Sequence, residues 1–111
     1  MTVDQLLEDH TPEIADLTRR LLERIQSAAS WKELRVYPGW HGIGLHHPDL
    51  GYVVGLFPRV DVVRVLFEHG ALLGTARFLE GSGSTRFVDF EDWDLARVAV
   101  VDDLVDRALA I

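Results

Sequence analysis

The sequence predicts an α+β domain in two layers, an antiparallel sheet with N- and C-terminal helices packed on one face. Two amphipathic helical patterns flank a central region of short β-type runs. The loops between these runs are short, which favours hairpins over parallel crossovers. The 111 residues fit one domain, residues 1–111, and 48% of them are hydrophobic, enough for a substantial core.

The N-terminal region predicts two helices. A short first helix is expected from four residues with helical spacing: Val3, Leu6, Leu7 and His10. Thr11 and Pro12 are typical of an N-cap followed by the first helical position. An amphipathic helix over Pro12–Ala29 is predicted by apolar residues at steps of three and four, namely Ile14, Leu17, Leu21, Leu22, Ile25 and Ala28.

The central region contains runs typical of strands: Leu34–Tyr37, His41–His47, Gly51–Phe57, Val60–Glu68 and Thr85–Phe90. Gly42 and Gly44 weaken the second run. In the fourth run we expect Val63, Val65 and Phe67 to face the core, because Arg64 falls on the opposite side.

The last element is predicted to be a helix over residues 94–110, capped by Asp92 or Asp94. Its apolar residues have helical spacing: Val98, Val101, Leu104, Val105, Ala108 and Leu109. We expect Val101, Val105 and Ala108 to be buried against the sheet.

Composition limits the function classes. The chain has no cysteine, which excludes disulfides and thiolate-bound metals, and its net charge of −7 argues against nucleic-acid binding. The N-terminus lacks a basic flank and a continuous apolar run, and no stretch is long and apolar enough to span a membrane. We therefore expect a cytoplasmic protein without a cofactor, whose partner is a small ligand or another protein.

The segment FEHGALLGTARFLEGSGSTRFVDF, residues 67–90, has a distinctive order of elements. With Val36-Tyr37-Pro38, Ile43 and the run Tyr52–Phe57, it resembles the YdhG-like family of small bacterial domains over roughly residues 31–109. Two positions depart from that family: Gly74-Thr75-Ala76 stands where Asp-Pro is usual, and Ser84 where a lysine is usual. The resemblance implies a secretion-chaperone-like fold and no established enzymatic activity. One branch of the family is assigned a frataxin-like iron-chaperone role.

Two features could bind an anion. Three arginines lie inside predicted strands and could form a positive stripe for a carboxylate or phosphate: Arg35, Arg64 and Arg86. The alternative is pairing with neighbouring acids: Glu33, Asp61 or Asp89. The loop of residues 80–86 could present backbone N–H groups to an anion, or could simply be a flexible connection into the last strand.

The acids near the C-terminus suggest a second kind of site. Asp102, Asp103 and Asp106 could form an acidic ridge that holds Fe²⁺ weakly, or could belong to a solvated helix face. Histidines are less suited to metal, because His41 and His47 would lie about 20 Å apart on a regular strand. A His46–Asp49 pair across the turn stays open.

No catalytic set emerges, since Ser82 and Ser84 lack the context of a nucleophile. The simplest interpretation places these aromatic residues in the core: Trp31, Trp40, Tyr52, Trp93 and the five Phe. An aromatic cluster on an exposed sheet face would instead mark a partner surface. The leading hypothesis is a non-enzymatic cytosolic binding or interaction domain. The alternative is a weak iron-binding chaperone using surface carboxylates, and an enzyme comes third.

Overall fold

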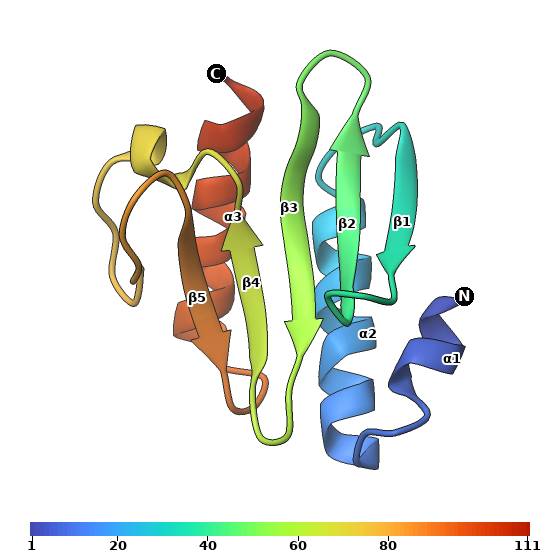
Figure 1. Ribbon diagram of the computed structural model, residues 1–111. Coiled ribbons are helices and arrows are strands. Elements are labelled where there is room, and N and C mark those ends of the chain that lie inside the picture. The colour runs from blue at the N-terminus through green and yellow to red at the C-terminus, as the bar shows by residue number, and fades with distance from the viewer.

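The computed structural model describes residues 1–111 and contains helices on one side of a single five-stranded sheet (Figure 1). The helical segments are α1 Val3–Leu7, α2 Pro12–Gln26, the 3₁₀ helix η1 Gly70–Leu73, and α3 Leu95–Leu109. The strands are β1 Glu33–Tyr37, β2 Gly42–His47, β3 Gly51–Pro58, β4 Val63–Phe67 and β5 Arg86–Phe90. The predicted α+β class is confirmed.

The sheet is an antiparallel meander in the order β1-β2-β3-β4-β5. Each strand pairs with the next one along the chain, as the short loops predict. The register between β2 and β3 shifts after Leu45, which pairs with Val54, whereas His46 pairs with Tyr52. This irregularity leaves Val53 as an extra residue on β3, and its side chain is buried.

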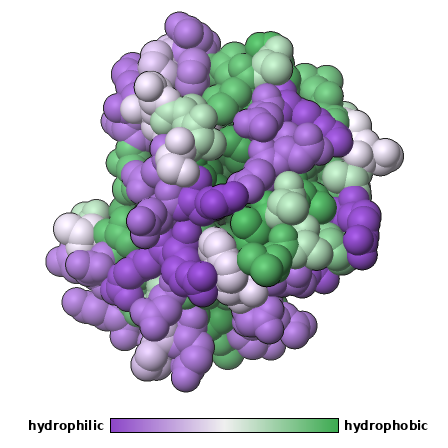
Figure 2. Space-filling model, turned by 180° about the vertical axis from the view of Figure 1, so that it is seen from behind, coloured by the Kyte–Doolittle hydropathy of each residue, from purple (hydrophilic) through white to green (hydrophobic).

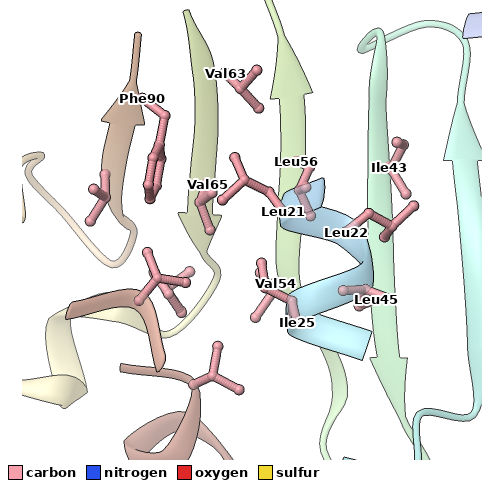
Figure 3. Close-up of a cluster of buried hydrophobic side chains, with 14 of the residues drawn as sticks. Leu21, Leu22, Ile25, Ile43, Leu45, Val54, Leu56, Val63, Val65 and Phe90 are labelled. Carbon is pink, nitrogen blue, oxygen red and sulfur yellow. The ribbon is translucent and has the colours of Figure 1, made fainter. Parts of the chain in front are cut away.

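The core lies between the sheet and the helices α2 and α3. Leu21, Leu22 and Ile25 of α2 face side chains from β2, β3 and β4, which Figure 3 shows at close range. On β4 the side chains of Val63, Val65 and Phe67 are buried, and Arg64 is not, so the predicted register of this strand is confirmed. The other residues expected in the core are also buried: Ile14, Leu17, Val101, Val105 and Ala108.

Helix ends follow the local sequence. The Thr11 side chain accepts a hydrogen bond from the amide of Ile14 at the start of α2, and Pro12 occupies its first turn. Asp94 caps α3, and its carboxylate accepts from the amides of Ala96 and Arg97. The expected capping acid at Asp92 or Asp94 is thus Asp94.

Element bounds differ from the sequence expectation where a turn shortens a strand or helix. The predicted run Val60–Glu68 begins only at Val63, because the amide of Arg59 donates to the carbonyl of Val62 and closes the hairpin. Helix α2 ends at Gln26, since Ser27 forms its C-cap. No helix combines the length and apolar character needed to cross a membrane.

The side formed by the helices carries both hydrophilic and hydrophobic residues (Figure 2). Polar contacts connect α2 with α3 and with the segment just before α3. Arg24 donates to both carboxylate oxygens of Asp102, at 3.1 and 2.7 Å, and the Arg20 guanidinium lies 4.0 Å from the centre of the Trp93 ring. The helices therefore cover one face of the sheet, and the opposite face, toward the viewer in Figure 1, has no helix over it.

Candidate functional site

The uncovered face of the sheet carries a cluster of aromatic side chains from β1, β2, β3 and the turn between β1 and β2. We call this cluster the aromatic face: Tyr37, Trp40, His46, Tyr52 and Phe57. The strand register brings its members together, because Tyr37 pairs with Gly42 and His46 pairs with Tyr52. Residues separated by tens of positions thus share one surface.

Glycines form the floor of the aromatic face. Gly44 of β2 pairs with Gly55 of β3 at the middle of the sheet, and Gly42 lies two residues earlier on β2, opposite Tyr37. A Cβ atom on Gly44 would lie 2.6 Å from Cε2 of Tyr37 and 2.9 Å from Cε2 of Tyr52. These strands therefore need glycine so that the rings can lie directly on the backbone.

The aromatic side chains contact one another. The ring centres of Tyr37 and Trp40 are 5.4 Å apart, and Tyr52 meets Tyr37 edge-on at 6.3 Å. The Tyr37 hydroxyl and His46 Nε2 form a hydrogen bond of 2.7 Å. Such contacts hold the rings in fixed positions, whereas the Trp40 side chain is 70% exposed at the edge of the cluster.

The electrostatic environment keeps this face neutral in its centre. Burial raises the pKa of the Tyr52 hydroxyl well above its ordinary value, with Glu68 adding to the effect. Burial lowers the pKa of His46, and the positive charge of Arg35 lowers it further. Both groups are therefore uncharged at neutral pH.

Paired charges border the aromatic face. Arg35 of β1 forms an ion pair with Glu33, which raises the pKa of Arg35 through the hydrogen bond. On β4, Arg64 donates to both oxygens of Asp89 at 2.9 and 3.0 Å and lies 3.7 Å from the centre of the Phe87 ring. The hydrogen bond to Asp89 raises the pKa of Arg64.

The structure does not bring together the three arginines that the sequence suggested for an anion. Arg35 and Arg64 share the outer face but belong to strands three positions apart, about 14 Å at ~4.8 Å per strand. Arg86 pairs in register with Phe67, whose side chain faces the core, so Arg86 lies on the opposite side of the sheet. The pairing of Arg64 with Asp89 is the alternative that the sequence left open.

The loop before β5 closes on Arg86. Nη1 of Arg86 donates to the carbonyl of Gly83 at 2.8 Å and to that of Thr85 at 2.7 Å, and an isolated bridge joins Glu80 to Phe87. The loop thus presents carbonyl oxygens to a guanidinium at this point. Carbonyl oxygens are acceptors, so this arrangement does not build the anion cradle of N–H groups that the loop could have formed.

The acids of α3 do not converge on a common point. Asp102 is paired with Arg24 and Asp103 with Arg107 at 2.6 Å, while Asp106 is exposed. Nowhere in the chain do three His, Asp or Glu side chains form a group suited to a metal ion. No feature of the geometry favours the Fe²⁺ ridge over a solvated, ion-paired helix face.

Three main hollows lie away from the aromatic face, one of them a polar hollow beside α2. An apolar pocket of about 180 Å³ opens between β4, η1 and the end of α3, and is lined by Val53, Phe67, His69, Leu72, Leu73 and Ala108 among others. It falls below the roughly 300 Å³ of ordinary small-molecule sites. A polar hollow near the start of α3 is lined mainly by acids, and there Arg97 donates to the backbone carbonyl of Asp89 and pairs with the carboxylate of Asp94.

Sequence reasoning placed most aromatic residues in the core, and only part of that expectation holds. Phe67 and Phe90 are fully buried, whereas Trp40 is exposed and Tyr52 lies on the outer face. The alternation of Gly42 and Gly44 with Ile43 and Leu45 is the signal that could have located the site. Alternate glycines on one face of a strand indicate that something packs close to its backbone.

Sequence reasoning also missed a contact between His10 and His41, whose Nε2 atoms are 2.6 Å apart.

Comparison with protein-family models, with curated proteins and with solved structures found no match. The resemblance to the YdhG-like family therefore stays a prediction, and the function is argued from the geometry alone.

Proposed function

We propose that this chain is a non-enzymatic interaction domain that binds a protein partner through the aromatic face. The observation that carries the proposal is the position of Trp40, which is 70% exposed and contacts Tyr37 at the edge of a sheet face that no helix covers. Tryptophan, tyrosine and arginine are the residues that contribute most to protein–protein affinity.

The shape of the surface favours a protein over a small ligand. The rings of Tyr37, Tyr52 and Phe57 lie over the glycine floor, and none of the three main hollows of the molecule is lined by them. Small ligands bind in concave pockets that enclose most of their surface. A surface with aromatic groups in mutual contact at its centre and ion pairs at its border matches the anatomy of protein interfaces.

The distribution of charge indicates which kind of partner the aromatic face would bind. The protein carries a net charge of −7, whereas the aromatic face has a neutral centre and paired charges at Arg35–Glu33 and Arg64–Asp89. A phosphate backbone would be repelled by most of the molecule and would find both arginines engaged. The surface suits a protein segment with apolar side chains and hydrogen-bonding groups.

The lack of cysteine is compatible with a reducing compartment, and we place the interaction in the cytoplasm.

Site-specific photo-crosslinking tests the proposal. A photoreactive amino acid replaces Trp40 in one variant and Leu95 in another; these two side chains are 70% and 74% exposed but lie on different surfaces. We expect the Trp40 position to capture a discrete protein in cells and the Leu95 position to capture none in common with it. Equal capture of the same proteins from both positions would show that the aromatic face is not a specific interface.

A further inference from the structure

Three segments that are distant in sequence meet at one end of the sheet. His10 lies in the connection between α1 and α2, His41 in the turn between β1 and β2, and Arg59 in the turn between β3 and β4. Both turns lie at the same end of the antiparallel meander (Figure 1). Nothing in the aromatic face explains why two imidazoles are directed toward each other here.

Hydrogen bonding fixes the state of His10. Its Nδ1 lies 3.1 Å from the carbonyl oxygen of Arg59, and its Nε2 lies 2.6 Å from Nε2 of His41. A carbonyl only accepts, so Nδ1 of His10 carries a proton and donates it. In the neutral ring Nε2 of His10 is then unprotonated, and its lone pair accepts a hydrogen bond from the Nε2–H of His41.

This arrangement is the one found around metal-bound histidines. A ligating imidazole commonly donates its second N–H to a backbone carbonyl, which fixes the tautomer and directs the free lone pair at the ion. His10 meets this condition through Arg59. His41 is held with φ of 53°, in the left-handed region that residues other than glycine seldom adopt, and such conformations are concentrated at functional sites.

We propose that His10 and His41 form a two-histidine site for a divalent transition metal ion of the Zn²⁺ class. Zn–N bonds of about 2.0–2.1 Å in tetrahedral geometry place two nitrogens ~3.3 Å apart, so the rings need to separate by about 0.7 Å from their present 2.6 Å. His41 changes its tautomer so that the proton moves from Nε2 to Nδ1, and no net proton is released from the neutral pair.

The ligand set determines which ion binds and how. Imidazole nitrogen favours Zn²⁺, Cu²⁺ and Ni²⁺ over Mg²⁺ and Ca²⁺, which take oxygen ligands. Two protein ligands leave the remaining positions to water, so the ion is exchangeable. The bound ion joins the α1–α2 connection to the sheet and thereby stabilises the folded state. The proposal is independent of the protein-binding role of the aromatic face.

Titration of metal-free protein with Zn²⁺ at neutral pH, followed by calorimetry and by thermal unfolding, tests the site. We expect one Zn²⁺ per chain, a rise in melting temperature that follows the binding isotherm, and no response to Mg²⁺. His10→Gln and His41→Asn should each weaken Zn²⁺ binding at least tenfold. Asn tolerates the left-handed backbone at position 41, so that variant separates loss of the ligand from loss of the turn.

His69→Gln is the matched control, because His69 is exposed at the opposite end of β4 and has no histidine neighbour among the ring contacts. It should bind Zn²⁺ as the wild-type protein does. The proposal is overturned if the wild-type protein shows no saturable binding of Zn²⁺. It is equally overturned if His10→Gln and His41→Asn bind as tightly as His69→Gln, or if Mg²⁺ produces the same stabilisation.

Discussion

Replacing Gly44 by alanine tests whether the aromatic rings lie directly on the sheet. The added Cβ would meet Cε2 of Tyr37 at 2.6 Å and Cε2 of Tyr52 at 2.9 Å. Carbon atoms in ordinary contact are about 3.5–4.0 Å apart, so both rings have to retreat by roughly 1 Å. The backbone beneath them has no comparable freedom, because Gly44 is paired on both sides, with Arg35 and with Gly55.

The expected cost follows from three terms. Overpacking costs about 1–3 kcal/mol, and displacing Tyr37 from its hydrogen bond with His46 costs a further ~1 kcal/mol. Alanine in a strand recovers about 0.5–1 kcal/mol of backbone entropy relative to glycine. The balance is a loss of roughly 1–3 kcal/mol, which lowers the urea midpoint by about 0.5–1.5 M for a slope near 2 kcal/mol/M.

Gly39→Ala is the matched control in the same region of the chain. A Cβ at Gly39 has nothing within 4 Å, and its φ is not in the left-handed region. We expect its free energy of unfolding to change by no more than about 0.5 kcal/mol, with a slight gain favoured. Equal midpoints for Gly44→Ala and Gly39→Ala in equilibrium urea unfolding would refute the close packing of the rings on the glycine floor.

Three further predictions concern the core, the pH dependence and the acids of α3. Leu21→Ala should lower the free energy of unfolding by roughly 2–5 kcal/mol because the side chain is 1% exposed, whereas Leu95→Ala, 74% exposed, should leave the urea midpoint nearly unchanged; similar losses in both would contradict the assignment of the core. Burial lowers the pKa of His46 from its ordinary value of 6.5. Just below pH 6.5 this imidazole is therefore protonated in the unfolded chain but still neutral in the folded protein. The stability from this neutral ring is fully present above that pH and is lost as the pH falls toward the lowered value, and a His46→Gln variant that lost stability just as steeply in acid would contradict this. For Fe²⁺, calorimetry at about 100 μM protein should detect no saturable binding, and Asp102→Asn/Asp106→Asn should destabilise the fold slightly by removing the interhelix ion pair; tight Fe²⁺ binding that this double variant abolishes would restore the iron hypothesis.

The fold was largely predictable because its signals are local. The spacing of apolar residues in Pro12–Gln26 and the alternation around Arg64 each specify which side of an element is buried, and the short loops specify an antiparallel order. Strand ends were less predictable. Val60, Asp61 and Val62 have strand-like composition, but a backbone hydrogen bond from Arg59 closes the turn there instead.

The candidate site depends on register, which composition does not give. Tyr37 and Tyr52 meet only because β2 lies between their strands and supplies Gly44 beneath both rings. The contact of His10 with His41 depends on how the α1–α2 connection lies against a turn 31 residues away. In the same way, Arg86 lies on the opposite face of the sheet from Arg35 and Arg64, and only its pairing with Phe67 shows this.

The affinity of the captured partner for a Trp40→Ala variant tests the proposed interface most directly. Trp40 is 70% exposed, so its removal should leave the urea midpoint close to that of the wild-type protein. If the aromatic face is the interface, the dissociation constant should rise at least about 30-fold, or ~2 kcal/mol, while Leu95→Ala binds normally. An unchanged dissociation constant for Trp40→Ala, or an equal loss in Leu95→Ala, would contradict the proposal that this face binds the partner.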